Sequence, residues 1–262
     1  MYNRKIFLLG GFGAISVLAL FFVAPIPQDL SYHEFADLRG LWGIPNFGDV
    51  MSNLPFCLVG LLGLWAVFQH RGDGSRTVYP SEGWMVTLAF LGITLVGPGS
   101  AYYHWFPTND TLLWDRLPMT IAFMSIFALM VLERVNVKAG QYLFPLLLVV
   151  GASSVFYWHH TETLGVGDLR PYVWVQFFPT LAIPFMLWQL PPRYTQTRQL
   201  WWMIGWYILA KVLEHFDKGV FVLLSGMVSG HSLKHFAAAM GTYHLVRYVQ
   251  KRRVLAETAG MT

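Results

Sequence analysis

The 262-residue sequence contains few charged residues and a single cysteine. Asp, Glu, Lys and Arg make up 12% of the chain, against roughly 25% in average soluble domains. The one cysteine, Cys57, lies within an apolar run, which excludes a disulfide-stabilised scaffold. Hydrophobic residues make up 55% of the chain, which excludes a disordered protein because disorder requires low hydrophobicity and many charges. The net charge of +4 does not indicate a nucleic-acid partner, since the basic residues form short scattered clusters rather than one stripe.

Long hydrophobic segments dominate the sequence, and its mean hydropathy is +0.46. A membrane-spanning helix needs about 20 mostly apolar residues, and eight segments approach this length. The seventh holds Lys211, Glu214 and His215, so we interpret it as a helix with one polar side. The first is longer than a usual signal-peptide core and no clear cleavage site follows it, which favours a retained helix. The sequence therefore predicts an all-α integral membrane protein. The segments are residues 6–25, 49–68, 84–104, 114–132, 141–158, 171–190, 200–216 and 229–249.

The charged residues distribute unevenly between the two sides of this predicted topology. Twelve of the 18 basic residues fall on one side, and ten of the 14 acidic residues fall on the other. Because loops rich in Lys and Arg stay in the cytoplasm, we expect both termini to be cytoplasmic and the acidic side to face outward. A count of seven spans would disrupt this alternation.

Seven of the nine histidines fall on the outer side of the predicted topology. Polar residues in membrane helices are costly and therefore mark candidate functional sites. The pair His231 and His235 is spaced i, i+4, which places both imidazoles on one helix face, where they can hold a single metal ion. The outer histidines are His33, His104, His159, His160, His215, His231 and His235.

A second group of polar residues is predicted to lie at the same level. Ser100 and His104 share one face at the end of their helix, and Asp115 begins the next helix. Three histidines with an open fourth position are typical of catalytic zinc, which lowers the pKa of its water to about 7 and polarises a carbonyl. Asp115 would then act as general base, and Ser100 would hold the water or the developing oxyanion by a hydrogen bond.

Each of these residues also has a purely structural interpretation. Asp115 can cap its helix or pair with Arg116, and Ser100 can be a small residue that allows close helix packing. His104 can belong to an interfacial aromatic belt, and a pair of histidines at i, i+4 can arise by chance. It is their coincidence on one membrane level that favours a metal site.

The pattern of Ser100 with His104, then Asp115, then His231 with His235 resembles the alkaline ceramidases, part of a membrane hydrolase superfamily that includes the progestin and adiponectin receptors. The segment Asn46–Leu54 resembles the start of the first core helix of that family. The resemblance covers about residues 30–250 and implies a seven-helix core. It divides the chain into an extra N-terminal transmembrane helix (1–28), a ceramidase-like domain (29–250) and a cytoplasmic C-terminal tail (251–262).

The resemblance implies that His104, His231 and His235 bind zinc, and that Ser100 and Asp115 assist the metal-bound water. The reaction implied is hydrolysis of the amide of a ceramide-like N-acyl lipid, taken from the bilayer, to a fatty acid and a sphingoid-type base. The extra first helix and the short loops indicate a bacterial relative in the inner membrane, with its active site on the outer, periplasmic side.

Two residues depart from the pattern of the family. Asn46 stands where the eukaryotic ceramidases have a glutamate, which argues against their calcium site (Ca²⁺) in this chain. Lys234 stands where those enzymes often have a tryptophan, which leaves ceramide itself open as the substrate. Neither departure affects the proposed hydrolytic residues.

Three other functions compete with a hydrolase. A receptor-like member of the superfamily would keep the zinc for structure alone. A di-iron desaturase or hydroxylase would use His159 and His160 as well, although such enzymes need about eight clustered histidines. A retinal-bearing pump would use Lys234 as a Schiff base. The sequence does not indicate an oligomeric state.

Overall fold

The computed structural model describes residues 2–255, which form ten α-helices and one 3₁₀ helix. This part of the chain contains no β-strand, only isolated bridges. The predicted C-terminal tail lies outside the described residues from residue 256 onward. The elements are α1 (Tyr2–Ala19), η1 (Leu30–His33), α2 (Phe47–Met51), α3 (Leu54–Gln69), α4 (Pro80–Trp105), α5 (Asn109–Arg134), α6 (Val137–Thr163), α7 (Arg170–Gln189), α8 (Thr197–His215), α9 (Asp217–Leu223) and α10 (Gly230–Lys251).

Each predicted apolar segment falls on a helix, but several ends differ from the prediction. α5 begins at Asn109 with Thr108 as its N-cap rather than near residue 114, so Asp115 lies in the second turn and, contrary to the prediction, neither begins nor caps the helix. α6 extends beyond the predicted 141–158 at both ends.

The first two segments also differ from the prediction. The first was expected to reach residue 25, whereas α1 ends at Ala19 before a segment that contains Pro25 and Pro27. The second is interrupted at Ser52, so that α2 and α3 are separate elements. Pro55 in the first turn of α3 accounts for the break, because proline has no N–H to donate and clashes with the preceding turn.

Four stretches of helix are long and apolar enough to cross a membrane, which identifies the chain as a membrane protein by length and composition. They are Phe47–Gln69, α4, α5 and α6. Charged residues lower the hydropathy of other long helices, as Arg4 and Lys5 do in α1. The count of seven or eight spans, and the extra N-terminal helix, therefore stay predictions.

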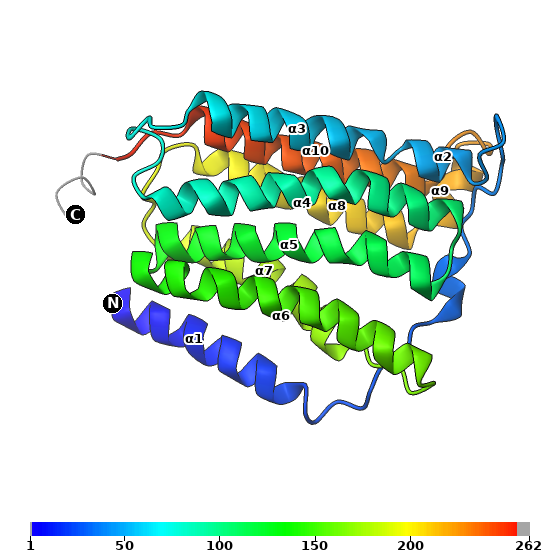
Figure 1. Ribbon diagram of the computed structural model, residues 1–262, viewed down its shortest axis with the longest axis horizontal. Helices are drawn as coiled ribbons and strands as arrows, with labels where there is room; N and C mark the ends of the chain where they lie inside the picture. Colours follow the sequence, from blue (N-terminus) through cyan, green and yellow to red (C-terminus); the bar gives the residue numbers. More distant parts are fainter. Residues whose placement is uncertain (1, 256–262) are drawn as a thin grey trace.

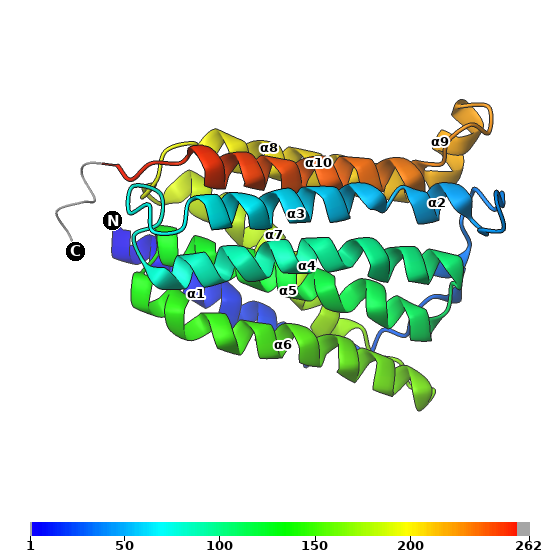
Figure 2. The same ribbon diagram turned by 45° about the horizontal axis from the view of Figure 1, so that its top comes forward.

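The long helices lie side by side and alternate in direction (Figures 1 and 2). α4 therefore ends at the same end of the bundle at which α5 and α10 begin. The start of α1 and the end of α10 both lie at the opposite end (Figure 1). This alternation matches the order of segments predicted from the sequence, and it places Ser100, His104, Asp115 and the pair on α10 at one end.

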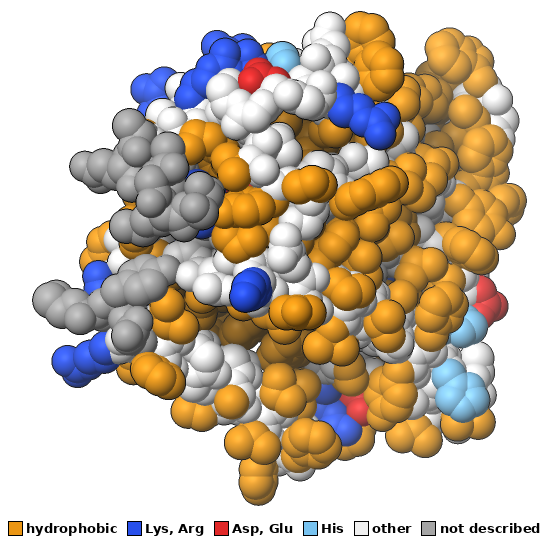
Figure 3. Space-filling model, turned by 60° about the vertical axis from the view of Figure 1, so that its left-hand side comes forward, with side chains coloured by type: hydrophobic (Ala, Val, Ile, Leu, Met, Phe, Trp, Pro, Cys, Tyr) orange, Lys and Arg blue, Asp and Glu red, His pale blue; other side chains and the backbone are white. Residues whose placement is uncertain are grey.

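α5 is the central helix of the bundle. It packs against α4, α6 and α7, and nearly every residue from Met124 to Arg134 is buried. The face shown in Figure 3 is mostly hydrophobic along the side of the bundle, and Lys and Arg side chains appear near the end where α10 finishes. Large apolar side chains such as Trp65, Trp188 and Phe68 are exposed on the surface of the bundle. Their exposure is favourable in an apolar environment, which agrees with a bundle embedded in lipid.

A cluster of buried charges connects three helices at the end of the bundle where α10 finishes. The guanidinium of Arg252, just after α10, forms ion pairs with Glu133 of α5 and with Glu82 of α4, the latter at 3.2 Å. Tyr194 donates to Glu82 at 2.6 Å and Tyr248 donates to Glu133 at 2.5 Å. The two acidic groups are therefore paired as buried charges must be, and α4, α5 and α10 are fixed relative to one another.

Candidate metal centre

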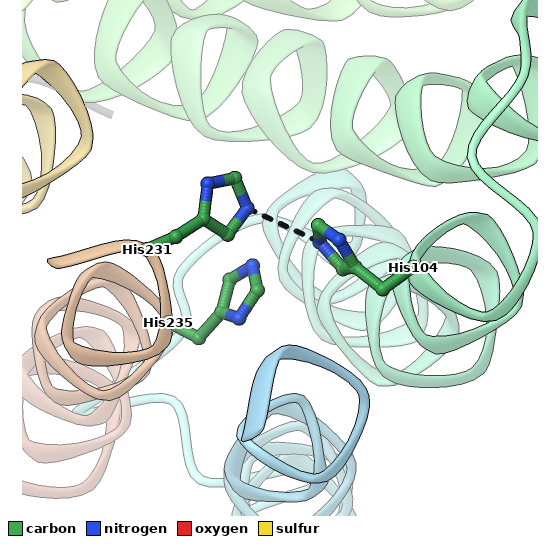
Figure 4. Close-up of side chains that lie close together, drawn as sticks. All are labelled: His104, His231 and His235. Atoms are coloured by element: carbon green, nitrogen blue, oxygen red, sulfur yellow. Dashed lines mark hydrogen bonds between the residues drawn. The ribbon is translucent and has the colours of Figure 1, made fainter. Parts of the chain in front are cut away.

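Three histidines from two helices turn toward one another at the end of the bundle where α4 finishes (Figure 4). His104 comes from the last turn of α4, and His231 and His235 come from the first two turns of α10. All three are buried, and one ring nitrogen from each lies within 4.8 Å of the others. The structure thus brings together the three ligands predicted from the sequence, and the cluster can hold a metal ion.

One pair of ring nitrogens has a separation compatible with zinc. His104 Nε2 and His231 Nε2 are 3.3 Å apart. Zinc lies about 2.0–2.1 Å from imidazole nitrogens, so two ligands at tetrahedral positions are separated by about 3.3–3.4 Å. Three imidazoles would leave a fourth position for water or substrate, as in catalytic sites, and one of the three, His235, lines a cavity.

A hydrogen bond to Ser52 fixes the orientation of the third ligand. The Ser52 hydroxyl donates to the carbonyl oxygen of Asp49 at 3.0 Å, and it lies 2.7 Å from His235 Nδ1. A hydroxyl whose proton is already used accepts from Nδ1–H, which leaves the lone pair on Nε2 for the metal. Ser52 lies within the segment Asn46–Leu54, but its residue type and spacing predicted no role for it.

We expect Ser52→Ala to weaken the binding of zinc by about 10- to 100-fold, because hydrogen-bond partners of metal-bound histidines contribute effects of this size. Zinc titration of the purified protein with a competing chelator measures the change. Ser154→Ala is the matched control, since the Ser154 hydroxyl is also buried and also donates to a carbonyl of its own helix, at 2.7 Å. Equal zinc affinities in wild type and Ser52→Ala would refute the orienting role.

The segment before α2 covers the histidines from outside. The Phe35 ring packs against His104 and His231, with centroid distances of 4.6 and 4.8 Å. The Asp217 carboxylate accepts from the backbone N–H of Ala36 at 3.0 Å and from that of His231 at 2.7 Å. The segment is therefore tied to the start of α10, and an aromatic ring excludes water from one side of the cluster.

Asn46 and Asp37 are both engaged within this covering segment. The side-chain amide of Asn46 donates to the backbone carbonyl of His104 at 2.8 Å. This bond stabilises the end of α4, which carries His104. The Arg39 guanidinium donates two hydrogen bonds of 2.7 Å to the carboxylate of Asp37. These bonds hold the pKa of Asp37 below its usual value. The Asp37 charge is thus neutralised by a side chain.

Ser100 and Asp115 meet where α4 and α5 approach most closely. A Cβ on Gly99 would lie 2.2 Å from the carbonyl oxygen of Trp114, so only glycine permits this approach. Ser100 follows Gly99 and Asp115 follows Trp114 in the chain. This close approach makes Ser100 and Asp115 hydrogen-bonding neighbours.

A cavity of about 690 Å³ opens beside the cluster. Ser100, Asp115 and His235 line its outer end, together with charged side chains of α8 and α10. Deeper along each helix the lining becomes apolar: Ile93 on α4, Ile126 on α5. Asp115 and Ile126 are eleven residues apart, so the apolar part extends about 16 Å along α5.

Other histidines of the outer level do not join the cluster. His33 lies 2.9 Å from the Tyr103 hydroxyl and 3.0 Å from Asn109 Oδ1. His159 pairs with Asp110 at 2.8 Å. Within residues 2–255, the group that could hold a metal contains only three histidines, which argues against the di-iron alternative.

Comparison with known proteins identifies the family. A family model described as ceramidase matches residues 44–261, which includes all five residues predicted for the site. No curated protein matches the chain. Because the match covers most of the sequence, the chain belongs to the ceramidase family.

Proposed function

We propose that this protein is a zinc-dependent intramembrane amidohydrolase that cleaves the amide of a ceramide-like N-acyl lipid. The observation that carries the proposal is the buried cluster of His104, His231 and His235, with the spacing of zinc ligands, beside a cavity lined by Ser100 and Asp115. Membership of the ceramidase family supports the same reaction.

Each residue of the site has a role that follows from its place. Zinc held by the three imidazoles supplies a Lewis acid that makes water nucleophilic near neutral pH and polarises the amide carbonyl. Asp115 accepts the proton of the attacking water and returns a proton to the departing amine nitrogen. Ser100 donates a hydrogen bond to the oxygen that gains negative charge. The products are a fatty acid and a sphingoid-type base.

The apolar part of the cavity matches one long chain of the substrate. Its deep part is lined by aliphatic and aromatic side chains, whereas the site residues lie at its polar end. Phe177 and Leu181 of α7 and Ile208 of α8 line the cavity and are 41%, 61% and 57% exposed, as expected where a cavity opens between two helices. A lipid can therefore reach the site sideways from the bilayer, between α7 and α8.

We also propose the topology that goes with this function. A seven-helix core of residues 29–250 follows an extra N-terminal helix, both termini are cytoplasmic, and the site faces the outer side of a bacterial inner membrane. The uneven distribution of basic and acidic residues between the two ends supports this orientation.

Release of fatty acid by the purified protein tests the proposed function. We expect about one zinc per chain, release of fatty acid from ceramide or a related N-acyl lipid, and loss of this activity after zinc is removed with a chelator. Zinc added back should restore the activity, whereas magnesium should not, because imidazole ligands do not suit magnesium. A zinc-loaded protein that cleaves no amide in a broad panel of N-acyl lipids would instead indicate a receptor-like member with structural zinc.

A further inference from the structure

Two lysines share one glutamate at the polar end of the cavity. Lys234 Nζ of α10 lies 2.7 Å from Glu214 Oε1 of α8, and both side chains are less than one-fifth exposed. Lys211 Nζ pairs with the other oxygen of the same carboxylate. The Tyr32 hydroxyl also reaches Glu214 Oε1, at 3.5 Å. All four residues line the cavity that Ser100 and His235 line.

The charged lining of the cavity carries an excess of positive charge. It contains three cationic side chains, Arg116, Lys211 and Lys234, and two anionic ones, Asp115 and Glu214. Arg116 is 5% exposed, and its Nη1 has no hydrogen-bond partner among the described residues. Its Nη2 donates to the neutral Gln28 Oε1 at 2.7 Å, and the guanidinium lies over the faces of Trp158 and Tyr172, at 4.2 and 4.6 Å. Within the lining of the cavity, the cationic side chains thus outnumber the anionic ones by one.

We propose that the cluster of Lys234, Lys211 and Arg116 binds an anionic group on the substrate, close to the amide that is cleaved. This inference rests on the proposed function and specifies the class of its substrate. A buried cation without a counter-charge is unfavourable, so a carboxylate, sulfonate or phosphate would complete the charge balance. Charge-assisted hydrogen bonds from ammonium and guanidinium groups suit these anions.

The geometry places the anionic group on the amine side of the amide. The acyl chain lies in the apolar part of the cavity, with the amide at the metal cluster. Lys234, the ligand His235 and Asp115 all line this cavity, so the ammonium borders the space that the amine side of the substrate would occupy. N-acyl amino acids carry a carboxylate on this side of the amide, and phosphorylated sphingolipids carry their phosphate slightly farther out.

A purely structural role for the lysines predicts a different result. If Lys234 only ties α10 to α8 through Glu214, its removal lowers stability and affects neutral and anionic substrates equally. If it binds the substrate, its removal changes the ratio between them. The ratio of kcat/KM values within a matched pair of substrates therefore separates the two roles.

Hydrolysis of two matched pairs by the full-length protein tests the proposal. N-palmitoylglycine and N-palmitoylethanolamine differ in a carboxylate, and ceramide 1-phosphate and ceramide differ in a phosphate. We expect the anionic member of at least one pair to be preferred by about tenfold or more in kcat/KM, and the pair concerned identifies the anion. Lys234→Met should lower that preference about tenfold, whereas Lys234→Arg should preserve most of it.

Lys138→Met is the matched control, since Lys138 is exposed at the start of α6, at the other end of the bundle. It should not change the ratio. If Lys234→Met does not fold, the ratio of kcat/KM values is measured with Lys211→Met instead. Hydrolysis of both members of each pair with equal kcat/KM, unaffected by Lys234→Met, would overturn this inference alone. Absence of hydrolysis with every substrate would instead contradict the proposed function.

Discussion

Replacement of His231 or His235 by alanine is expected to remove the zinc and to lower lipid hydrolysis by at least about 10³-fold. Loss of one of three buried ligands leaves two imidazoles, which cannot hold the ion against bulk water. A bound metal stabilises the transition state by several kcal/mol, and each 1.36 kcal/mol is a factor of ten in rate. Metal analysis of the purified variants and fatty-acid release measure both effects.

His215→Ala is the control for this experiment. His215 belongs to the histidines predicted at the same level, but it is exposed and contacts only the Phe216 ring, at 4.7 Å, among the ring contacts of the described residues. It should retain both zinc and activity. The proposed metal centre would be wrong if His231→Ala kept a full equivalent of zinc, or if it lost zinc and still hydrolysed the lipid at the wild-type rate.

Asp115→Asn should keep the zinc and lose about 10²- to 10⁴-fold in turnover, the range attributed to general acid–base catalysis. Asp115 lines the cavity but is not part of the histidine cluster, so metal binding does not depend on its charge. Asparagine has nearly the same shape, yet it cannot accept and return a proton. The single-turnover rate and the zinc content of the same preparation separate chemistry from metal binding.

Asp110→Asn and Ser100→Ala complete that series. Asp110 lies on the same helix, 83% exposed, and its ion pair is with His159, so its substitution should leave turnover unchanged. Ser100→Ala removes one hydrogen-bond donor and should cost less than Asp115→Asn. Turnover of Asp115→Asn at the wild-type rate would show that another group, or the metal-bound water alone, moves the proton.

The positions of the helices follow largely from hydrophobicity, whereas their ends follow from local residues. Apolar runs of about 20 residues predicted each of the long helices, because a helix satisfies its own backbone in lipid. The short helix α9, the interruption at Ser52 and the early end of α1 were not predicted. Pro55 lies close to the interruption at Ser52, but its effect is smaller than the hydrophobic signal, and Pro25 lies too far beyond Ala19 to account for the end of α1.

The metal ligands could be predicted because their type and spacing are both unusual. His231 and His235 share a helix face, and the alternating topology brings His104 to the same end. A histidine in a membrane helix is rare enough to carry information by itself. The roles of Ser100 and Asp115 stay predictions, although the structure places the two side by side on the cavity.

The supporting residues could not be found in the same way. Ser52, Phe35 and Asp217 touch the cluster from three separate segments, and each is an ordinary residue type with no distinctive spacing. The pairing of Lys234 with Glu214 depends on the rotation of α8 against α10, which hydrophobic periodicity does not specify. In the sequence, Lys234 is a departure from the family and a candidate Schiff-base lysine, but nothing there pairs it with Glu214.

The ligands of the metal cluster are synthesised at different times, His104 well before His231 and His235. His104 and His231 are separated by 127 residues, and at about 5–20 residues per second the ribosome needs about 6 to 25 s to add them. Until α10 has been synthesised and inserted beside α4, the nascent chain offers a single imidazole and no zinc site. A lipid hydrolase built in this way cannot attack the membrane that receives it before its last helix is in place.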